Sequence, residues 1–497
     1  MDEELASVSL LTRQVYVAAD SINLARDQLL FFACTVFAFV GSALFNLLLP
    51  PVRTSTALRH AVLTTFGVLL LFYCYGGTQT CILVVVSVVS QLLMQYAPAN
   101  YMHVLVFIVS MGCLAGTHIF NMVFHFGEYK VDYTGSLMVI TAKISGMAFA
   151  LHDGVYKKAE SLTAEQKQLS LARFPCLLEY YSYLFNFPSA LAMPMASFKE
   201  YATFVSGASL PADIRSGKKR LFSNYLPAFG KAGYGIILLG LHLVISPMFP
   251  ILDTAKEDFL GYSFVYRVAY MYVAGLFLRC RYYFAFVFAD STVNAAGFGH
   301  CVDKKTGQSS WDGCTNIRPF SVELATSPKT AIDNWNIQTG RWLRYIAYER
   351  FPWAPRVATF VLSAIWHGFY GGYLVSMPFS AFLGEAAVRV RRRVRPYFQT
   401  SSSRALLYDQ ITRIGTMVHM NYALTPFMCL EFWPGMLAWR NVYFFGTFTI
   451  FGVLLFVPAK KRPAPATATA NGVVSDGSNG VVSNGSSGSN GIKPHSQ

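Results

Sequence analysis

Two polar residues interrupt apolar stretches of the chain, and each could take part in proton transfer or hydrogen bonding. His367 lies in the run LSAIWHGFYGGY, twelve residues after Pro355 and eleven before Pro378. If this run is one membrane-crossing helix, His367 lies roughly 17 Å from either end, at the midplane of a hydrocarbon core about 30 Å thick. An ionisable group at that depth normally faces an interior cavity. Because burial disfavours the imidazolium, His367 should be neutral and able to accept a proton.

The second residue, Asn336, precedes this run in the segment TAIDNWNIQTGRWLRYIAY. The pattern predicts a continuous helix over Thr330–Tyr348, and a side-chain amide on its apolar face needs a hydrogen-bond partner. At 3.6 residues per turn, that face carries Ile332, Asn336, Thr339, Gly340, Leu343, Ile346 and Ala347. Histidine and asparagine in apolar helices are often only structural hydrogen-bonding groups, so position alone does not decide their role.

A neutral histidine and a buried asparagine that face a cavity in lipid can perform acyl transfer to a hydroxyl group. The histidine would remove the hydroxyl proton while the oxygen attacks a thioester carbonyl. The asparagine amide would hold a reacting group or the developing oxyanion. The sequence has no serine-hydrolase elbow, P-loop, dinucleotide-binding or zinc-protease motif, and no Cys/His spacing typical of a metal site. We therefore expect no metal and no bound cofactor.

Membrane-spanning helices are the elements that must position these residues. The chain has 497 residues, of which 54% are hydrophobic and only 13% charged, whereas soluble proteins have about 25% charged residues. We expect an all-α, polytopic transmembrane helical bundle of about 10–11 spans. Apolar runs long enough to cross lie near residues 29–49, 61–75, 80–96, 101–124, 137–151, 181–197, 234–252, 264–288, 355–378, 415–430 and 442–457.

The net charge of +14 is concentrated in short loops beside apolar runs. Its clusters are Ser216–Arg220, Arg389–Arg395 and Lys460–Arg462. Basic clusters that flank spans mark the cytosolic side and attract anionic lipid headgroups. This distribution predicts contact with membrane lipids and argues against a nucleic-acid partner.

The chain divides into a membrane domain, residues 1–457, and a tail, residues 458–497. The tail is rich in Pro, Ala, Ser, Asn and Gly and cannot bury apolar area, so we expect it to be disordered in the cytosol. The N-terminus lacks the apolar core of a cleavable signal peptide. We expect the nine cysteines to be free thiols; a disulfide between Cys301 and Cys314 would form only if their loop were luminal.

The segments WNIQTGRWLRYIAYERFPW (335–353) and TFVLSAIWHGFYGGY (359–373) together resemble the signature of the membrane-bound O-acyltransferase family. The likeness is closest to its lysophospholipid acyltransferase branch. It extends to residues 120–154 and 183–207, and so to most of residues 20–457. By this resemblance, the family's catalytic asparagine falls on Asn336 and its catalytic histidine on His367.

The resemblance implies a bundle that encloses a catalytic tunnel in the endoplasmic reticulum membrane, with acyl-CoA as co-substrate. The acceptor would be lysophosphatidylethanolamine, lysophosphatidylserine or lysophosphatidylcholine, and an unsaturated acyl chain would pass to its free glycerol hydroxyl in phospholipid remodelling. Further candidates for lining the substrate site are Trp335, Trp366, Gly368 and Tyr373. Related sequences tend to have proline where this chain has Gly371, a departure that would affect the shape of the tunnel and leave the catalytic pair alone.

Two alternatives stay open. Members of the wider superfamily acylate sterols, diacylglycerol or proteins; the sterol and diacylglycerol enzymes carry an FYxDWWN-like motif, and this chain has Asp333-Asn334-Trp335-Asn336 without the preceding Phe-Tyr pair. A non-enzymatic transporter would carry charges within several spans or matching broken helices in two halves. Its main candidates are Glu128, Lys130, Arg279 and Arg281, which we interpret as interface residues.

Overall fold

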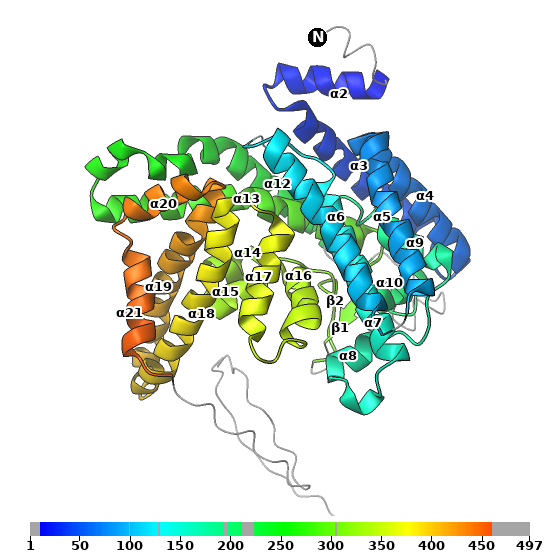
Figure 1. Ribbon diagram of the computed structural model, residues 1–497. Coiled ribbons are helices and arrows are strands. Elements are labelled where there is room, and N and C mark those ends of the chain that lie inside the picture. Colours follow the sequence, from blue (N-terminus) through cyan, green and yellow to red (C-terminus); the bar gives the residue numbers. More distant parts are fainter. Residues whose placement is uncertain are drawn as a thin grey trace, which may run out of the picture. The chain divides into compact units, whose positions relative to one another are not determined.

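The computed structural model describes residues 10–98, 100–127, 130–192, 197–210, 223–303 and 306–459. These residues are almost entirely helical (Figure 1), and the strands among them are the short antiparallel pair β1 (Cys301–Val302) and β2 (Ser309–Ser310). The predicted all-α fold is confirmed. The basic clusters at 216–220 and 460–462, and the tail from residue 460 onward, lie outside the described residues, so the domain boundary stays a prediction.

Long apolar helices dominate the first part of the chain. After α2 (Leu10–Ser21) come α3 (Arg26–Leu48), α4 (Thr56–Tyr75), α5 (Gly77–Tyr96), α6 (Met102–Phe124) and α7 (Thr134–Val155). Helix α7 is the most enclosed of the long apolar helices, since 72% of its most apolar window is buried, against 33–39% for α3 to α6. This element therefore lies inside the bundle, where the other helices shield it from lipid.

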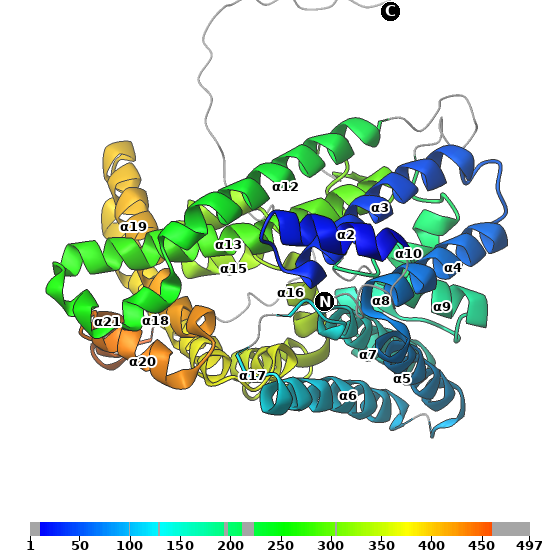
Figure 2. The same ribbon diagram turned by 90° about the horizontal axis from the view of Figure 1, so that it is seen from above.

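The middle of the chain begins with short elements and continues with long helices. The short ones are η1 (Ala159–Ser161), α8 (Ala164–Leu169), α9 (Leu177–Phe185) and α10 (Phe198–Val205). Helix α12 (Tyr225–Ile245) then packs along α13 (Phe264–Ala295), and the two run side by side in Figure 2. Three 3₁₀ turns connect them: η2 (Ser246–Met248), η3 (Ile251–Ala255) and η4 (Glu257–Gly261).

The last part of the chain carries the candidate site. It begins with α14 (Pro319–Glu323), α15 (Pro328–Asn334), α16 (Ile337–Leu343), the π-helical turn η5 (Arg344–Tyr348) and α17 (Pro355–His367). It ends with α18 (Gly371–Phe398), α19 (Ser402–Cys429), α20 (Phe432–Arg440) and α21 (Phe445–Phe456). Helix α17 packs against η5 and α18, so the helix that ends at the candidate histidine also contacts the segment that follows Asn336.

The structure confirms a multi-pass membrane protein, with fewer candidate spans among the described residues than the sequence led us to expect. Among the described residues, seven helical segments are long and apolar enough to cross: α3 to α7, Tyr225–Ala255 and α13. The pair α20 and α21, bent by 81°, would make eight. The expected ten or eleven is higher because some apolar runs form short or broken helices. The run 181–197, for example, contains only the end of α9 before its backbone leaves the helix.

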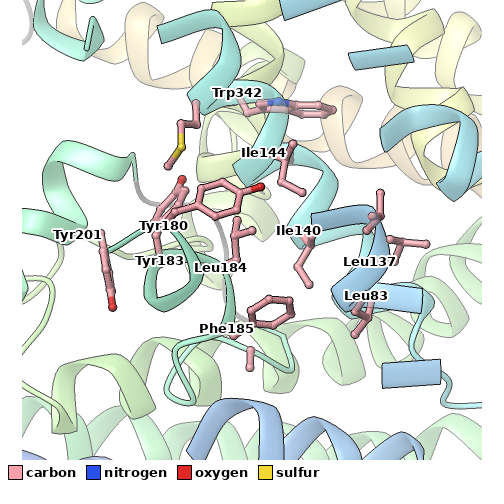
Figure 3. Packing of buried hydrophobic residues seen from close by; sticks show 14 of the residues in the cluster. Leu83, Leu137, Ile140, Ile144, Tyr180, Tyr183, Leu184, Phe185, Tyr201 and Trp342 are labelled. Atoms are coloured by element: carbon pink, nitrogen blue, oxygen red, sulfur yellow. The ribbon is translucent and has the colours of Figure 1, made fainter. Parts of the chain in front are cut away.

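The largest hydrophobic cluster joins α7 to α9 and to the candidate site (Figure 3). Leu137, Ile140 and Ile144 of α7 belong to this cluster together with Tyr180 and Tyr183 of α9, and all five are buried. Trp342 of α16 enters the same cluster and donates a hydrogen bond from its indole N–H to Ser145 Oγ over 3.0 Å. Helix α16 is therefore fixed to the enclosed helix α7.

Candidate active site

The backbone breaks at Asn336, so the predicted continuous helix over residues 330–348 is wrong. Helix α15 ends at Asn334, and Trp335 is extended. Asn336 adopts the left-handed conformation, with φ 49° and ψ 51°, immediately before α16 begins at Ile337. Asparagine enters this region more readily than most residues. The expected apolar face is therefore split: Thr339, Leu343, Ile346 and Ala347 are buried, whereas Ile332 and Gly340 are exposed.

Asn336 has two hydrogen-bond partners at this break. Its Oδ1 accepts from Asn316 Nδ2 over 3.0 Å and from Thr339 Oγ1 over 2.7 Å. The predicted need for an amide partner is confirmed, and Asn336 itself is half-buried.

Asn316 is the residue that sequence reasoning missed. It is only 1% exposed, and its carbonyl oxygen and Oδ1 accept from the backbone N–H groups of Ile337 (2.7 Å) and Gln338 (2.9 Å). These N–H groups open α16 and have no partner within the helix. In the sequence, Asn316 ends the polar stretch WDGCTN in the loop before α14. Nothing in this stretch indicates which helix the Asn316 side chain contacts.

A second break follows His367, so the prediction of one crossing with this residue at its centre is also wrong. Helix α17 ends at His367 because Gly368 has a φ of +119°, which side-chain-bearing residues rarely adopt. A Cβ at position 368 would lie 3.2 Å from Nδ1 of His118. The histidine therefore lies at the C-terminal end of a thirteen-residue helix, and α18 begins four residues later at Gly371.

Aromatic rings surround the half-buried imidazole of His367. Its ring centroid lies 4.8 Å from that of Trp366, 5.4 Å from Phe427 and 6.1 Å from Tyr373. Among the described residues, no side chain or backbone group forms a hydrogen bond with either imidazole nitrogen. The ring can therefore bind or deprotonate a small polar group that enters this aromatic enclosure.

The turn beside His367 is held by a second histidine. His118 of α6 donates from Nε2 to the carbonyl oxygen of Trp366 over 3.1 Å. The indole N–H of Trp366 donates to the carbonyl oxygen of Met138 over 3.2 Å. The end of α17 is thus tied to α6 and α7, and His118 is a further site residue that its position in an apolar run did not reveal.

Gly371 and Gly372 allow close packing of α18. A Cβ on Gly371 would lie 2.6 Å from Cβ of Phe432, and one on Gly372 would lie 2.0 Å from the carbonyl oxygen of Pro426. Glycine in a membrane helix allows either the approach of another helix or the approach of a ligand. Here both glycines face the chain around the end of α19 and the start of α20, which explains them by packing alone.

The structure gathers the candidate residues in two groups. Trp366, His367, Gly368 and Tyr373 form one, while Trp335 and Asn336 belong to another, in which the Trp335 ring packs 5.7 Å from that of Tyr283. The Trp342–Trp366 ring pair, 5.9 Å apart, joins the helices that carry the two groups. Within the described part of the chain, no hydrogen bond joins Asn336 to His367 directly.

Two hollows in the described part of the chain include neither candidate catalytic residue. One is lined by residues of α7 and by Gln338, Arg341 and Trp342 of α16. The other is mainly apolar and lies between α3 and α13. Because neither lining contains Asn336 or His367, the predicted catalytic tunnel stays a prediction.

Two of the charges that a transporter might use, Arg279 and Arg281, have partners inside the protein. Arg279 is 4% exposed and forms an ion pair with Glu323 over 2.8 Å, so it lies inside the protein, and its position at the membrane interface stays a prediction. Arg281 donates to the hydroxyl of Tyr282, and Glu128 lies outside the described residues. Across the described ranges, no group of three or more His, Cys, Asp or Glu side chains is placed to hold a metal ion.

All nine cysteines are free thiols, as predicted. The conditional disulfide is not formed: the Cys301 sulfur contacts Ser310 Oγ at 3.0 Å, and Cys314 is buried separately. Burial raises the pKa of the Cys314 thiol well above its ordinary value. Cys314 is therefore poorly suited to act as a nucleophile.

The fold and the site define a multi-pass helical membrane protein with an ionisable residue at the junction of two helices. Residues 118–429 match the sequence pattern of the membrane-bound O-acyltransferase family, and this segment contains Asn316, Asn336 and His367. The chain belongs to this family and is an acyltransferase.

Similar proteins cover most of the chain. The membrane-bound glycerophospholipid O-acyltransferase 2 of Rattus norvegicus is 36% identical over 462 residues, which are 91% of this chain and 89% of the relative. The human membrane-bound glycerophospholipid O-acyltransferase 1 is 35% identical over 89% of this chain and 92% of its own length. Lysophospholipid acyltransferase 6 of Drosophila melanogaster is 31% identical over 91% of this chain and 65% of its own length.

Proposed function

We propose that this protein is an acyl-CoA-dependent lysophospholipid O-acyltransferase that remodels phospholipids in the endoplasmic reticulum membrane. The observation that carries the proposal is the similarity over about nine tenths of the chain to proteins named glycerophospholipid and lysophospholipid acyltransferases. The acceptor is lysophosphatidylethanolamine, lysophosphatidylserine or lysophosphatidylcholine. The donor carries an unsaturated acyl chain, as the resemblance to this branch implies.

In the proposed reaction, His367 is the general base. Its imidazole accepts the proton of the free glycerol hydroxyl while the oxygen attacks the thioester carbonyl carbon. The tetrahedral intermediate then collapses, the carbon–sulfur bond breaks, and the proton passes from the imidazolium to the leaving thiolate of CoA. The support is that His367 has no hydrogen-bond partner among the described residues and lies within an aromatic enclosure.

The remaining candidates shape the site around this base. Trp366 and Tyr373 contribute rings next to the imidazole, and the backbone at Gly368 ends α17 so that the imidazole lies at a helix terminus. Trp335 packs against Tyr283 and precedes Asn336, whose amide binds or stabilises a reacting group. We also propose the apolar hollow between α3 and α13 as space for hydrocarbon, because its lining is almost wholly apolar.

The test uses purified protein in detergent with a panel of lysophospholipids and acyl-CoAs, read by mass spectrometry beside His367→Ala. We expect the wild-type protein to form diacyl phospholipid and the variant to form none, because the reaction loses its base. The panel ranks the headgroups and acyl chains.

His242→Ala is the matched control, since His242 is another half-buried histidine, on α12, that bonds through Nδ1 to the carbonyl oxygen of Phe277. It should retain activity, and both variants should keep the melting temperature of a folded protein. Equal activity of wild type and His367→Ala would make His367 a structural residue. Acylation of a sterol, diacylglycerol or peptide in place of every lysolipid would assign the enzyme to another acceptor class.

A further inference from the structure

We infer that Asn316 is a positioning residue that fixes the amide of Asn336 as a hydrogen-bond donor toward the reacting groups. The inference rests on the proposed function and decides between two roles that are open to the side chain of Asn336. An asparagine amide can accept a proton-bearing group through Oδ1 or stabilise an oxyanion through Nδ2. A chain of hydrogen bonds selects the second role.

The chain of hydrogen bonds begins at a backbone N–H group, which can donate a hydrogen bond and cannot accept one. The backbone N–H of Gln338 is always a donor, and it points at the Asn316 side chain over 2.9 Å. The atom of Asn316 that receives it must therefore be Oδ1. Because Asn316 is only 1% exposed and its carbonyl oxygen also accepts from the N–H of Ile337, this side chain is held from two sides.

The next link follows from the geometry of an amide. With Oδ1 turned to Gln338, the Nδ2 of Asn316 faces Asn336 and donates over 3.0 Å. Its partner must be an acceptor, which identifies that atom as the Oδ1 of Asn336. The hydroxyl of Thr339 donates to the same oxygen over 2.7 Å. Both lone pairs of this oxygen are then occupied.

The last link is the free end of the amide. The Nδ2 of Asn336 points away from Asn316, and no acceptor for it exists among the described residues. Asn336 is half-buried, so its two N–H donors are available to a bound molecule. These N–H groups can donate hydrogen bonds to the thioester carbonyl oxygen and to the oxyanion that develops on it. They would repel the N–H groups of an imidazolium. Asn336 therefore stabilises the oxyanion and does not orient His367.

Asn316→Asp tests this polarity because it keeps the shape of the side chain and the oxygen that accepts from Gln338. It places a second oxygen opposite Asn336, so the Asn336 amide turns over and presents Oδ1 to the substrate. We expect kcat to fall roughly 10²- to 10³-fold, as when one oxyanion donor is lost. The KM for acyl-CoA should change little. Asn334→Asp makes the same chemical change two residues from Asn336, without a side-chain bond to it, and should leave kcat unchanged.

Repeating Asn316→Asp in an Asn336→Ala background separates positioning from general structural damage. A positioning residue acts through Asn336, so the second substitution should cost no further activity. If Asn316→Asp does not fold, Thr339→Val removes the other donor without changing the side-chain shape; kcat should fall several-fold in the native chain and not at all beside Asn336→Ala. Wild-type kcat in Asn316→Asp, or additive losses in the double variants, would overturn the inference. Failure of the wild-type protein to acylate any lysolipid would instead overturn the proposed function.

Discussion

At the scale of single residues, the availability of His367 depends on the residues that hold the turn beside it. Gly368 ends the helix, and His118 ties down the carbonyl of Trp366, so the imidazole is presented at a helix end with no protein hydrogen bond among the described residues. Asn336 likewise depends on a left-handed backbone and on Asn316. Each candidate group is thus positioned by a residue that does no chemistry itself.

Gly368→Ala should lower acyl transfer about 10- to 100-fold. A side chain at φ +119° is strained by about 1–3 kcal/mol, and its Cβ would press on the ring of His118 at 3.2 Å. The measurement is kcat/KM together with the melting temperature in detergent. Gly384→Ala is the control, because a Cβ there meets nothing within 4 Å. An unchanged kcat/KM in Gly368→Ala would show that the turn tolerates a side chain.

Cys314 should resist alkylation across the mildly alkaline range. The thiolate is the reactive form, and because burial raises the pKa of this thiol, it stays neutral at pH values where an ordinary cysteine has begun to ionise. Exposed Cys176 should react with iodoacetamide in the native protein, and Cys314 only after unfolding. Peptide mapping by mass spectrometry at pH 7.5 and 9 measures both sites. Rapid native labelling of Cys314 would contradict its burial.

At the scale of elements, the site is made by interruptions of helices. One interruption separates α15 from α16 at Asn336, and another separates α17 from α18 after His367. Each break leaves backbone groups without partners in their own helix, and residues of other segments provide those partners. Asn316 accepts hydrogen bonds from the N–H groups that open α16. The carbonyl oxygen of Leu430 accepts from the N–H of Gly372 over 2.9 Å. The breaks are therefore built into the packing of neighbouring elements.

Gly371→Pro should destabilise the protein. The backbone suits proline, because residue 371 is the first of α18. Its Cβ would nevertheless lie 2.6 Å from Cβ of Phe432, and overpacking of this kind costs about 1–3 kcal/mol. The measurement compares the melting temperatures of Gly371→Pro, of Phe432→Gly and of the variant that carries both substitutions. Gly371→Pro should lower the melting temperature less in the Phe432→Gly variant than in the native chain. An equal loss in both would exclude the contact with Phe432 as the cause.

At the scale of the whole membrane domain, buried polar contacts join elements that are far apart in sequence. Arg279 of α13 binds Glu323 of α14 through two hydrogen bonds, of 2.8 and 2.9 Å, and also donates to Asn421 of α19. Tyr283, which packs against Trp335, donates to the same glutamate. This network connects α13, α14 and α19 to Trp335, which directly precedes Asn336.

Arg279→Met should therefore destabilise the fold strongly. It leaves the Glu323 carboxylate, which is only 14% exposed, without its charged partner, and breaking one side of a buried pair costs about 3–5 kcal/mol. Arg440→Met is the control, since Arg440 and Glu257 form an exposed pair that is worth at most about 1 kcal/mol. Thermal unfolding in detergent compares the two variants. Equal melting temperatures would show that the Arg279 network adds little to stability.

The sequence by itself determined the class of the molecule and its two candidate residues. Hydropathy depends on composition along the chain, so it predicted an all-α membrane protein; the pairing of W-N with W-H-G then indicated Asn336 and His367. Tertiary structure decided where the helices break and which groups hold the breaks, because these depend on contacts between distant segments. Asn316 meets Asn336 across 20 residues, and His118 meets Trp366 across 248, distances along the chain that no local pattern of residues records.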